Sequence, residues 1–545
     1  MRILPVVSSL VHCFVPAWLS KSYKSQNAVG DSTIDDPTMR LNPFPTLLSL
    51  GICAGIVSAT YLNDARSLQP RRQTSMLIDP AAQPDLPTIN AATAAANAVN
   101  LNLKDIQGDI LIGMKKKSEL FFFFGISNAK DFKKNLKSTI LPLVTNTAQL
   151  LDVSAQPQTA LNIAFSQTGL RALNVTDDLK DSPFSGGQLQ DIANLGDPGT
   201  TNWVPEFVGT NIHGVILLAS DTPDNIKATL SSLKAKLGNS VKEIYSLQGA
   251  ARPGNQEGHE HFGYLDGISN PAVQGFQSPL PGQAVVPTGE ILVGENGDGV
   301  TGRPPWAKDG SFLVFRQLKQ LVPEFNKFLT DNPIRAPTLT AKQGSDLLGA
   351  RMIGRWKSGA PVFLAPLVDD PVLGADPNRN NNFTYGAPGQ TTGSSNATDQ
   401  SKCPFSAHIR KTRPRADLGL PESSSSNHHI VRGGIPYGPE VTPNEAASNT
   451  TKTERGLAFV SYQSNIANGF QFLQHLWADN ARFIHAGVGF DPIIGANQGA
   501  PRVVTGLDLM NVSRPITLTT DFVVSRGGEY FFSPSLSAIA NTLSV

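Results

Sequence analysis

Three separated stretches of this chain contain side chains that could handle protons, metal ions and negative charge. Asp266 lies in the glycine-bracketed loop Gly263–Gly267, where a carboxylate can act as a general base and the glycines allow close backbone approach to a ligand. His408 lies in the segment Ala407–Lys411, and a neutral imidazole is a common metal ligand. Arg432 precedes two glycines and carries a permanent positive charge. Taken alone, each residue also has an ordinary interpretation: Asp266 as a turn residue, His408 as a surface histidine and Arg432 as a solvated arginine.

Taken together, the three stretches resemble the dye-decolorising peroxidases, a family of haem enzymes. The resemblance runs from about Asp105–Asp109 to Arg526–Phe532 and so covers most of the chain. It implies that Asp266 and Arg432 face the peroxide side of the iron and that His408 is the axial ligand behind it. No Cys-x-x-Cys-His motif occurs, so we expect one haem b that is held without thioether bonds.

The resemblance assigns two further polar residues to the haem site. Asp491 matches the segment that supplies an acceptor for the second ring nitrogen of the axial His, although an Asp before Pro is also typical of a turn. Arg410, Arg413 and Arg415 are candidates for pairing with the haem propionates, because a guanidinium binds carboxylates in a bidentate manner. Arg415 is the preferred partner of a haem propionate. The alternative is that all three arginines are solvated surface residues.

The implied reaction is reduction of hydrogen peroxide coupled to one-electron oxidation of phenols and bulky aromatic dyes. Leu457 and Phe459 occupy the family's Gly-Leu-x-Phe strand and are expected to narrow the pocket, which is compatible with ordinary strand core. A bulky dye should therefore react at the surface. An Asp base, with an ordinary pKa of about 3.9, predicts an activity optimum below about pH 5.

Tyr437 and Trp477 match positions that serve as surface radical sites in family members. The turn Pro436–Gly438 is expected to expose the ring of Tyr437. The alternatives are that Tyr437 packs against a neighbouring loop and that Trp477 fills the core side of an amphipathic helix.

The composition and the N-terminal segment limit which partners and which cellular location the protein can have. The 545 residues have a formal net charge of +1 and no basic run beyond Lys115–Lys117, which argues against nucleic acid. Two apolar runs, residues 4–19 and 45–59, are shorter than the ~20 residues that a stable membrane span needs, so we expect secretion. An N-terminal anchor is the alternative. The second run follows Met39, a candidate start site.

Cysteines and glycosylation sequons are consistent with an exported protein. Cys13 and Cys53 lie in the predicted leader, so Cys403 alone would remain after processing and no disulfide within the mature chain is expected. Asn-x-Ser/Thr sequons, which predict glycosylated surface loops, occur at Asn174, Asn382, Asn396, Asn449 and Asn511.

Alternating strand and helix patterns predict an α+β fold of two ferredoxin-like domains. These would be a duplication with antiparallel sheets and peripheral helices. The family resemblance implies the same duplicated fold and places the haem in the C-terminal domain. The predicted parts are an export signal or start-site extension (1–60), a disordered pro-segment (61–101), an N-terminal domain with the Gly-x-x-Asp-Gly loop (102–285) and a C-terminal haem-binding domain (286–545).

Two other classes of function stay open at this point. A haem-binding or haem-processing protein could use the same fold, because fold does not determine function. A secreted glycan-binding or adhesive protein without haem would have a similar composition. Peroxide-dependent turnover would separate the first from a peroxidase, and a Soret band would exclude the second.

Overall fold

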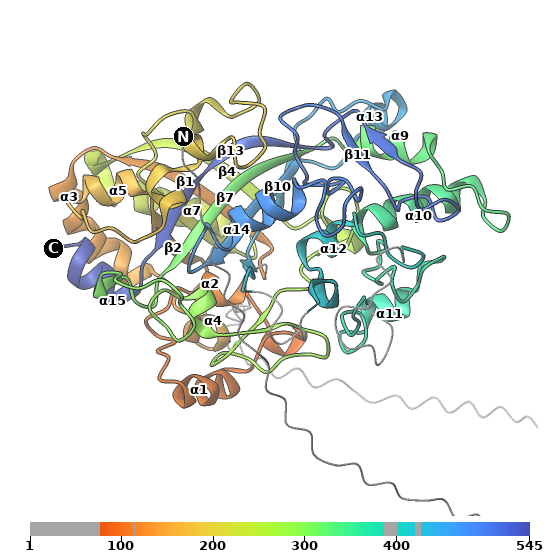
Figure 1. Ribbon diagram of the computed structural model, residues 1–545. Helices are drawn as coiled ribbons and strands as arrows, with labels where there is room; N and C mark the ends of the chain where they lie inside the picture. Colours follow the sequence, from red (N-terminus) through yellow and green to blue (C-terminus); the bar gives the residue numbers. More distant parts are fainter. Residues whose placement is uncertain (1–76, 114, 386–399, 420–426) are drawn as a thin grey trace, which may run out of the picture. The chain divides into compact units, whose positions relative to one another are not determined.

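The computed structural model describes residues 77–113, 115–385, 400–419 and 427–545, which belong to one compact unit, Arg72–Val545 (Figure 1). Both predicted export runs, Met39, Cys13, Cys53 and the sequon at Asn396 lie outside the described residues. Within the described part of the chain, none of the helices combines the length and the apolar character that crossing a bilayer requires.

The predicted disorder of residues 61–101 is wrong for residues 77–101. Helix α1 (Ile89–Ala98) begins after Thr88, whose side chain caps its N-terminus. The helix buries Ala92 and Ala96 against the main core, because small side chains let it pack closely. The disorder prediction rested on Arg71–Arg72, the spaced prolines and the Ala/Asn tract at residues 90–100. Alanine is a good helix former, and in this tract that property prevails.

The first half of the fold is a four-stranded antiparallel sheet in the order β2-β3-β1-β4. Its strands are β1 (Ser118–Ile126), β2 (Ala160–Phe165), β3 (Gly214–Ser220) and β4 (Val241–Ala250). Helices follow β1, β2 and β3 along the chain, which is the alternation predicted for a ferredoxin-like unit.

The second half repeats this arrangement. Its main strands are β7 (Ser311–Gln320), β10 (Gly456–Gln463) and β13 (Val523–Ser533), in the order β13-β7-β10, and all of their pairings are antiparallel. Two short strands, β8 (Val431–Arg432) and β9 (Ile435–Tyr437), pair with the far edge of β10. The equivalent strand order in the two halves confirms the predicted α+β duplication.

Two single-residue pairings join the halves into one nine-stranded sheet that closes into a barrel. Phe532 of β13 pairs with Phe165 of β2, and Tyr437 of β9 pairs with Gly249 of β4. Because β7 also pairs with β10, no break remains in the ring. The predicted domain boundary at 285/286 falls inside the short strand β6 (Val285–Val286), and this boundary stays a prediction.

The core lies on both faces of the strands, as the phenylalanine run of β1 shows. Phe121 and Phe123 pack inward against Phe315 of β7, with ring centroids 5.0 and 4.9 Å apart. Phe122 and Phe124 point to the opposite face and belong to a second cluster with the helices. A strand buried on both sides explains the continuous apolar run.

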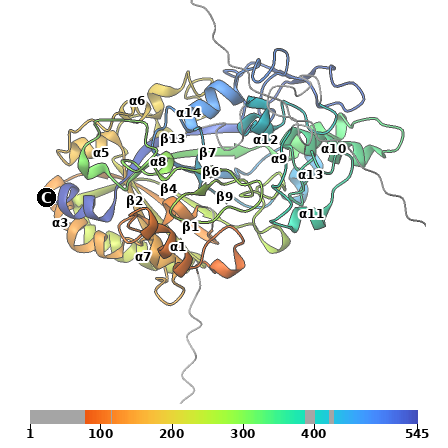
Figure 2. The same ribbon diagram turned by 60° about the horizontal axis from the view of Figure 1, so that its bottom comes forward.

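Helices gather at opposite ends of the sheet (Figures 1 and 2). Helices α3 and α5 of the first half lie at one end, and α7 packs against β3 and β1. The segment from α9 to α13, which includes α12 (His408–Thr412), lies at the other end. The remaining bounds in the first half and the segment that follows it are α2 (Gly108–Ile112), α3 (Ala129–Asn135), α4 (Thr147–Leu151), α5 (Gln167–Ala172), α6 (Ser182–Gly186), α7 (Pro223–Leu237), β5 (Ala272–Val273) and α8 (Thr288–Ile291). Those in the second half are α9 (Val322–Asp331), α10 (Ala341–Ile353), α11 (Pro371–Ala375), α13 (Pro443–Ser448), α14 (Phe470–Phe472), β11 (Arg502–Val504), β12 (Ile516–Leu518) and α15 (Leu536–Ala538).

Candidate active site

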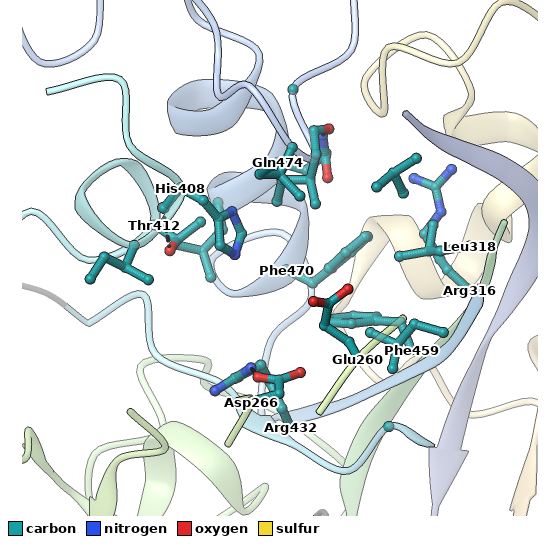
Figure 3. A pocket seen from close by; sticks show the side chains of 18 of the residues that line it. Glu260, Asp266, Arg316, Leu318, His408, Thr412, Arg432, Phe459, Phe470 and Gln474 are labelled. Atoms are coloured by element: carbon teal, nitrogen blue, oxygen red, sulfur yellow. Dashed lines mark hydrogen bonds and ion pairs between the residues drawn. The ribbon is translucent and has the colours of Figure 1, made fainter. Parts of the chain in front are cut away.

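A cavity of about 390 Å³ collects most of the residues that the sequence singles out. Asp266, His408, Arg432, Leu457 and Phe459 all line it, although they come from a loop, helix α12 and strands β8 and β10. Much of the remaining lining is apolar, which is typical of a site for a flat organic ligand. Figure 3 shows His408 reaching the cavity from one side and Asp266 and Arg432 together from another.

His408 is oriented by a buried carboxylate. Its Nδ1 lies 2.8 Å from Oδ2 of Asp491, which is fully buried. Oδ1 of Asp491 accepts the N–H groups of Ile493 and Ile494 at 2.8 and 3.0 Å, so both oxygens are engaged. Burial alone would lower the pKa of His408, but the charge and hydrogen bond of Asp491 raise it above its ordinary value. With Nδ1 engaged, Nε2 is the ring nitrogen left for a ligand.

Asp266 and Arg432 form an ion pair at the cavity wall. Nη1 of Arg432 donates to Oδ1 of Asp266, and the N–H of Gly267 donates to the same oxygen at 2.6 Å. Among the described residues, Oδ2 of Asp266 has no hydrogen-bond partner. Burial raises the pKa of Asp266. The charge of Arg432 and these hydrogen bonds lower the pKa by more than burial raises it, so the pKa lies below its ordinary value.

The loop of Asp266 also contacts the main chain of Arg432 through Asn270. Nδ2 of Asn270 donates to the Arg432 carbonyl and Oδ1 accepts the Arg432 N–H, both at 3.2 Å. Gly113, with φ +72°, packs behind this contact, and a Cβ there would lie 2.5 Å from the Arg432 carbonyl oxygen. The loop and strand β8 are therefore joined by one side-chain ion pair and by two hydrogen bonds to the backbone.

Three arginines line another part of the cavity. Arg410, which the sequence also suggested as a partner of a haem propionate, is not among them. Arg415, Arg413 and the unpredicted Arg355 are lining residues. Arg415 and Arg355 both contact Oδ1 of Asn381, at 2.6 and 3.2 Å. Arg410 instead binds Asp417 with Nε and Nη2 and stacks on Phe405, 3.9 Å from the ring centroid. Arg410 is therefore a structural residue, because Asp417 and the aromatic ring take up its guanidinium.

The predicted exposure of Tyr437 is wrong. Its side chain is 5% exposed, and its hydroxyl donates to Oε1 of Glu454 at 3.1 Å. The reason is that Pro436–Tyr437 ends strand β9 and pairs with β10 and β4, whereas the sequence suggested a free turn. Short strands interrupted by glycine lack the alternation that identifies a strand in a sequence.

Trp477 is equally buried, as in the core alternative considered for it. It stacks on Phe483, with ring centroids 4.9 Å apart, and its ring is nearly perpendicular to that of His428, whose centroid is 5.5 Å away. His428 lines the cavity, so the indole lies one aromatic residue behind the cavity wall. Neither Tyr437 nor Trp477 presents its ring as a surface site.

Sequence reasoning missed Glu260 as well as Asn270 and Arg355. Glu260 lines the cavity and accepts the N–H groups of Phe262 and Tyr264, both at 2.8 Å. Burial raises its pKa. The one sequence feature that could have suggested Glu260 is its position six residues before Asp266. A single Glu at that spacing does not form a recognisable motif, so the sequence did not predict its role. Figure 3 shows Glu260 on the same side of the cavity as Phe459.

Comparisons with known proteins agree with this geometry. The family description "DyP dimeric alpha+beta barrel domain" matches residues 105–253, and "Dyp-type peroxidase, C-terminal" matches residues 352–484. The chain is 56% identical over 521 residues to the dye-decolorizing peroxidase msp1 of Mycetinis scorodonius, which covers 92% of this chain and all of that protein. It is 54% identical over 527 residues to the dye-decolorizing peroxidase AauDyP1 of Auricularia auricula-judae, with coverage of 93% and 100%.

Solved structures show the same likeness. A crystal structure of the Auricularia auricula-judae decolorizing peroxidase has a TM-score of 0.78 and 56% identity, and covers 82% of this chain and all of that one. The chain therefore belongs to the dye-decolorising peroxidase family. This membership favours the peroxidase interpretation over the two alternatives raised by the sequence.

The family implies a haem cofactor, and the residues of this chain fit one. The cavity wall has apolar residues for a macrocycle, among them Leu457, Phe459 and Phe470. His408 offers an imidazole whose other nitrogen is held by a carboxylate, the arrangement that makes a metal-ligating His more basic. Arg355, Arg413 and Arg415 place positive charge where propionates could be bound.

Proposed function

We propose that this protein is a haem peroxidase that reduces hydrogen peroxide and oxidises phenols and bulky aromatic dyes in one-electron steps. The observation that carries the proposal is that His408, Asp266 and Arg432 line one cavity and that each belongs to an oriented pair. One pair is His408 with Asp491, and the other is Asp266 with Arg432. Together they offer a metal ligand, a proton acceptor and a fixed positive charge around a single apolar space.

One non-covalent haem b would be held by His408 through Nε2. The absence of a Cys-x-x-Cys-His motif supports non-covalent binding. Arg415 is the preferred partner of a propionate, with Arg413 and Arg355 as neighbours along the same wall. When bound, the haem supplies the electrons that reduce the peroxide and accepts electrons in turn from the organic substrate.

Asp266 would move the proton that the reaction needs. Its Oδ1 is engaged by Arg432 and Gly267, so Oδ2 is the atom left to take a proton from one peroxide oxygen and return it to the other. Arg432 would hold the peroxide and stabilise negative charge as the oxygen–oxygen bond breaks. Leu457 and Phe459 would narrow the space and exclude large substrates.

Bulky dyes would then have to donate electrons from outside the cavity. Tyr437 and Trp477 stay candidates for an electron path, because phenol and indole side chains are oxidisable. Their burial means that they would act as interior relays and not as the point of dye contact. His428, between Trp477 and the cavity, supports a path that passes Trp477.

The substitution Asp266→Asn tests the function. We expect haem to bind normally, with the rate of reaction with peroxide lowered about 10²–10⁴-fold, since an amide cannot accept the proton. The rate is measured as the change of the Soret band after mixing with one equivalent of hydrogen peroxide. Asp346→Asn, at an exposed carboxylate that forms an ion pair with Lys342, is the matched control. Normal rates in Asp266→Asn at every pH would remove Asp266 from the mechanism. Release of iron from the haem would favour a haem-processing protein.

We also propose that the protein is secreted and glycosylated. The support is the pair of short apolar runs near the N-terminus and the position of the sequons. The sequons within the described residues all have an exposed asparagine: Asn174, Asn382, Asn449 and Asn511. Expression in a eukaryotic host should give medium-borne protein whose mass falls on treatment with an N-glycosidase. If all of the expressed protein stayed inside the cells, secretion would be contradicted.

A further inference from the structure

Lys411 is a buried lysine that lies one turn after His408 in helix α12. Its Nζ donates to three main-chain carbonyls: that of Trp477 at 3.3 Å, that of Asn480 at 2.8 Å and that of Phe483. An ammonium group has three N–H bonds, so these carbonyls take up all of its donors. Lys411 is not among the described residues that line the main cavity, so its effect on the site must pass through other residues.

The charge of Lys411 is also related to the axial pair. Burial lowers the pKa of Lys411 to about 8, while the charges of Asp491 and Asp479 raise it. The side chain is therefore an ammonium ion below about pH 8, and a buried ion is stable only when its polar atoms are bound. The carboxylate of Asp491, which orients His408, is thus an electrostatic partner of Lys411 as well.

The chain segment that binds Lys411 also holds the main chain of Asp491. The carbonyl of Ala478 accepts the Asp491 N–H at 2.9 Å, and the carbonyl of the preceding residue, Trp477, accepts Nζ of Lys411. Adjacent carbonyls therefore bind the helix that carries His408 and the loop that carries Asp491. The carbonyl of Asp491 has a separate anchor, because it accepts Nη1 of Arg502 at 2.9 Å.

The hydrogen bond between His408 and Asp491 depends on how these two segments are placed. The residues are 83 positions apart, and their side chains meet at 2.8 Å. A hydrogen bond weakens steeply when its angle or distance departs from the favourable range. A small shift of α12 relative to residues 477–491 would therefore weaken the contact that orients the imidazole.

We propose that Lys411 is a positioning residue for the axial pair. By binding the carbonyls of residues 477–483, it holds α12 against the segment that anchors Asp491 and so sets the hydrogen bond between His408 and Asp491. The inference rests on the proposed function in one respect, which is that His408 ligates the haem iron. A carboxylate partner makes a metal-ligating imidazole more basic, so Lys411 controls the strength of the iron–His408 bond without contacting iron or substrate.

The test removes the ammonium group and keeps nearly the same side-chain length. Lys411→Met is the main variant, and Lys411→Gln keeps two N–H donors without the charge. Arg455→Met is the matched control, because Arg455 is also a buried cation that binds a main-chain carbonyl, that of Pro439 at 2.8 Å, and a carboxylate, that of Glu445. These partners lie outside α12 and residues 477–495. The haem-loaded proteins are reduced, and resonance Raman spectroscopy gives the frequency of the iron–histidine stretch.

We expect this frequency to fall in Lys411→Met and to fall by less in Lys411→Gln, because a weaker hydrogen bond to Asp491 leaves the imidazole less basic. Haem transfer to excess apomyoglobin should become about tenfold faster in Lys411→Met, at the lower end of the 10–100-fold losses that follow removal of an outer partner of a metal ligand. Arg455→Met should lose thermal stability but keep the wild-type frequency.

A wild-type frequency in both Lys411 variants would overturn the proposal. An equal fall in Arg455→Met would also overturn it, since the effect would then follow from a general loss of stability. If the wild-type protein shows no iron–histidine band, His408 is not the ligand and the proposal fails with it. If it shows the band but does not reduce peroxide, the proposed function fails, and the comparison of the Lys411 variants still decides the role of Lys411.

Discussion

The side-chain amide of Asn270 pairs with the main chain of Arg432 through two hydrogen bonds of 3.2 Å, one to its carbonyl and one from its N–H. The pairing resembles the contact of a neighbouring strand. It lies four residues from Asp266, so the loop that holds the carboxylate also sets the position of the guanidinium's backbone. Asn270 itself is buried, and its carbonyl accepts Nε2 of Gln283 at 2.9 Å.

We predict that Asn270→Leu lowers the rate of reaction with peroxide about 10- to 100-fold, because a small displacement of Arg432 weakens its alignment with Asp266. Asn270→Asp keeps an acceptor for the Arg432 N–H but loses the donor to its carbonyl, so an intermediate loss is expected. Rapid mixing with peroxide gives the rates. Asn135→Leu, which removes a comparable amide contact to Ser240 far from the cavity, is the control. A loss of thermal stability with an unchanged peroxide rate and pH profile would show that Asn270 is merely structural.

His408→Ala should lose haem or hold it weakly, because the fully buried Asp491 binds Nδ1 of this imidazole and leaves Nε2 for a ligand. Of the other imidazoles in the described cavity wall, His429 also contacts a carboxylate, Glu290, through Nδ1. The ratio of Soret to protein absorbance after reconstitution measures haem content. His475→Ala, at an exposed position, should bind haem like the wild type. Full occupancy with an unaltered spectrum in His408→Ala would move the assignment to His428 or His429, which also line the cavity.

The pH profile should depend on Arg432. Burial raises the pKa of Asp266, and Arg432 is the first of the groups that lower it below its ordinary value. The ionised, proton-accepting form therefore persists until the pH falls through this lowered pKa, which fits an optimum for dye turnover below about pH 5. In Arg432→Leu the burial remains and the cation is gone, so the pKa rises and the acid limb of the peroxide rate moves to higher pH.

Rates measured across the acid range in Arg432→Leu and in the exposed control Arg335→Leu would check this shift. An acid limb at the same pH in both variants would show that Arg432 does not control the ionisation of Asp266. A wild-type optimum near neutrality would point to a histidine as the base instead.

Tyr437→Phe removes a hydroxyl that donates to Glu454, a carboxylate able to take the phenolic proton when the ring is oxidised. If Tyr437 is an interior relay, this variant keeps its peroxide rate and its turnover of small phenols but loses much of its turnover of bulky dyes. Trp477→Phe should give the same pattern if the path passes that residue. Trp306→Phe, whose indole packs against Phe532 away from the cavity, is the control. Equal losses on small and bulky substrates would argue against an electron path through either residue.

The sequence by itself determined the chemical groups and the duplicated pattern of elements. Asp266, His408 and Arg432 lie in short stretches whose residue types match a family, and local identity is retained whatever the fold. The buried strand β1 and the helix α7 were also predictable, because apolar periodicity depends only on the neighbours along the chain.

The tertiary structure alone decided which distant residues meet. His408 and Asp491 are 83 residues apart, and Asp266 and Arg432 are 166 apart, so only the packing of the loop, α12 and the barrel edge brings them together. The two hydrogen bonds of Asn270 to the main chain of Arg432 and the burial of Tyr437 depend on the short strands β8 and β9. These strands gain their stability from pairing with β10 and β4 and not from their own sequence. They therefore cannot be predicted from a local sequence pattern.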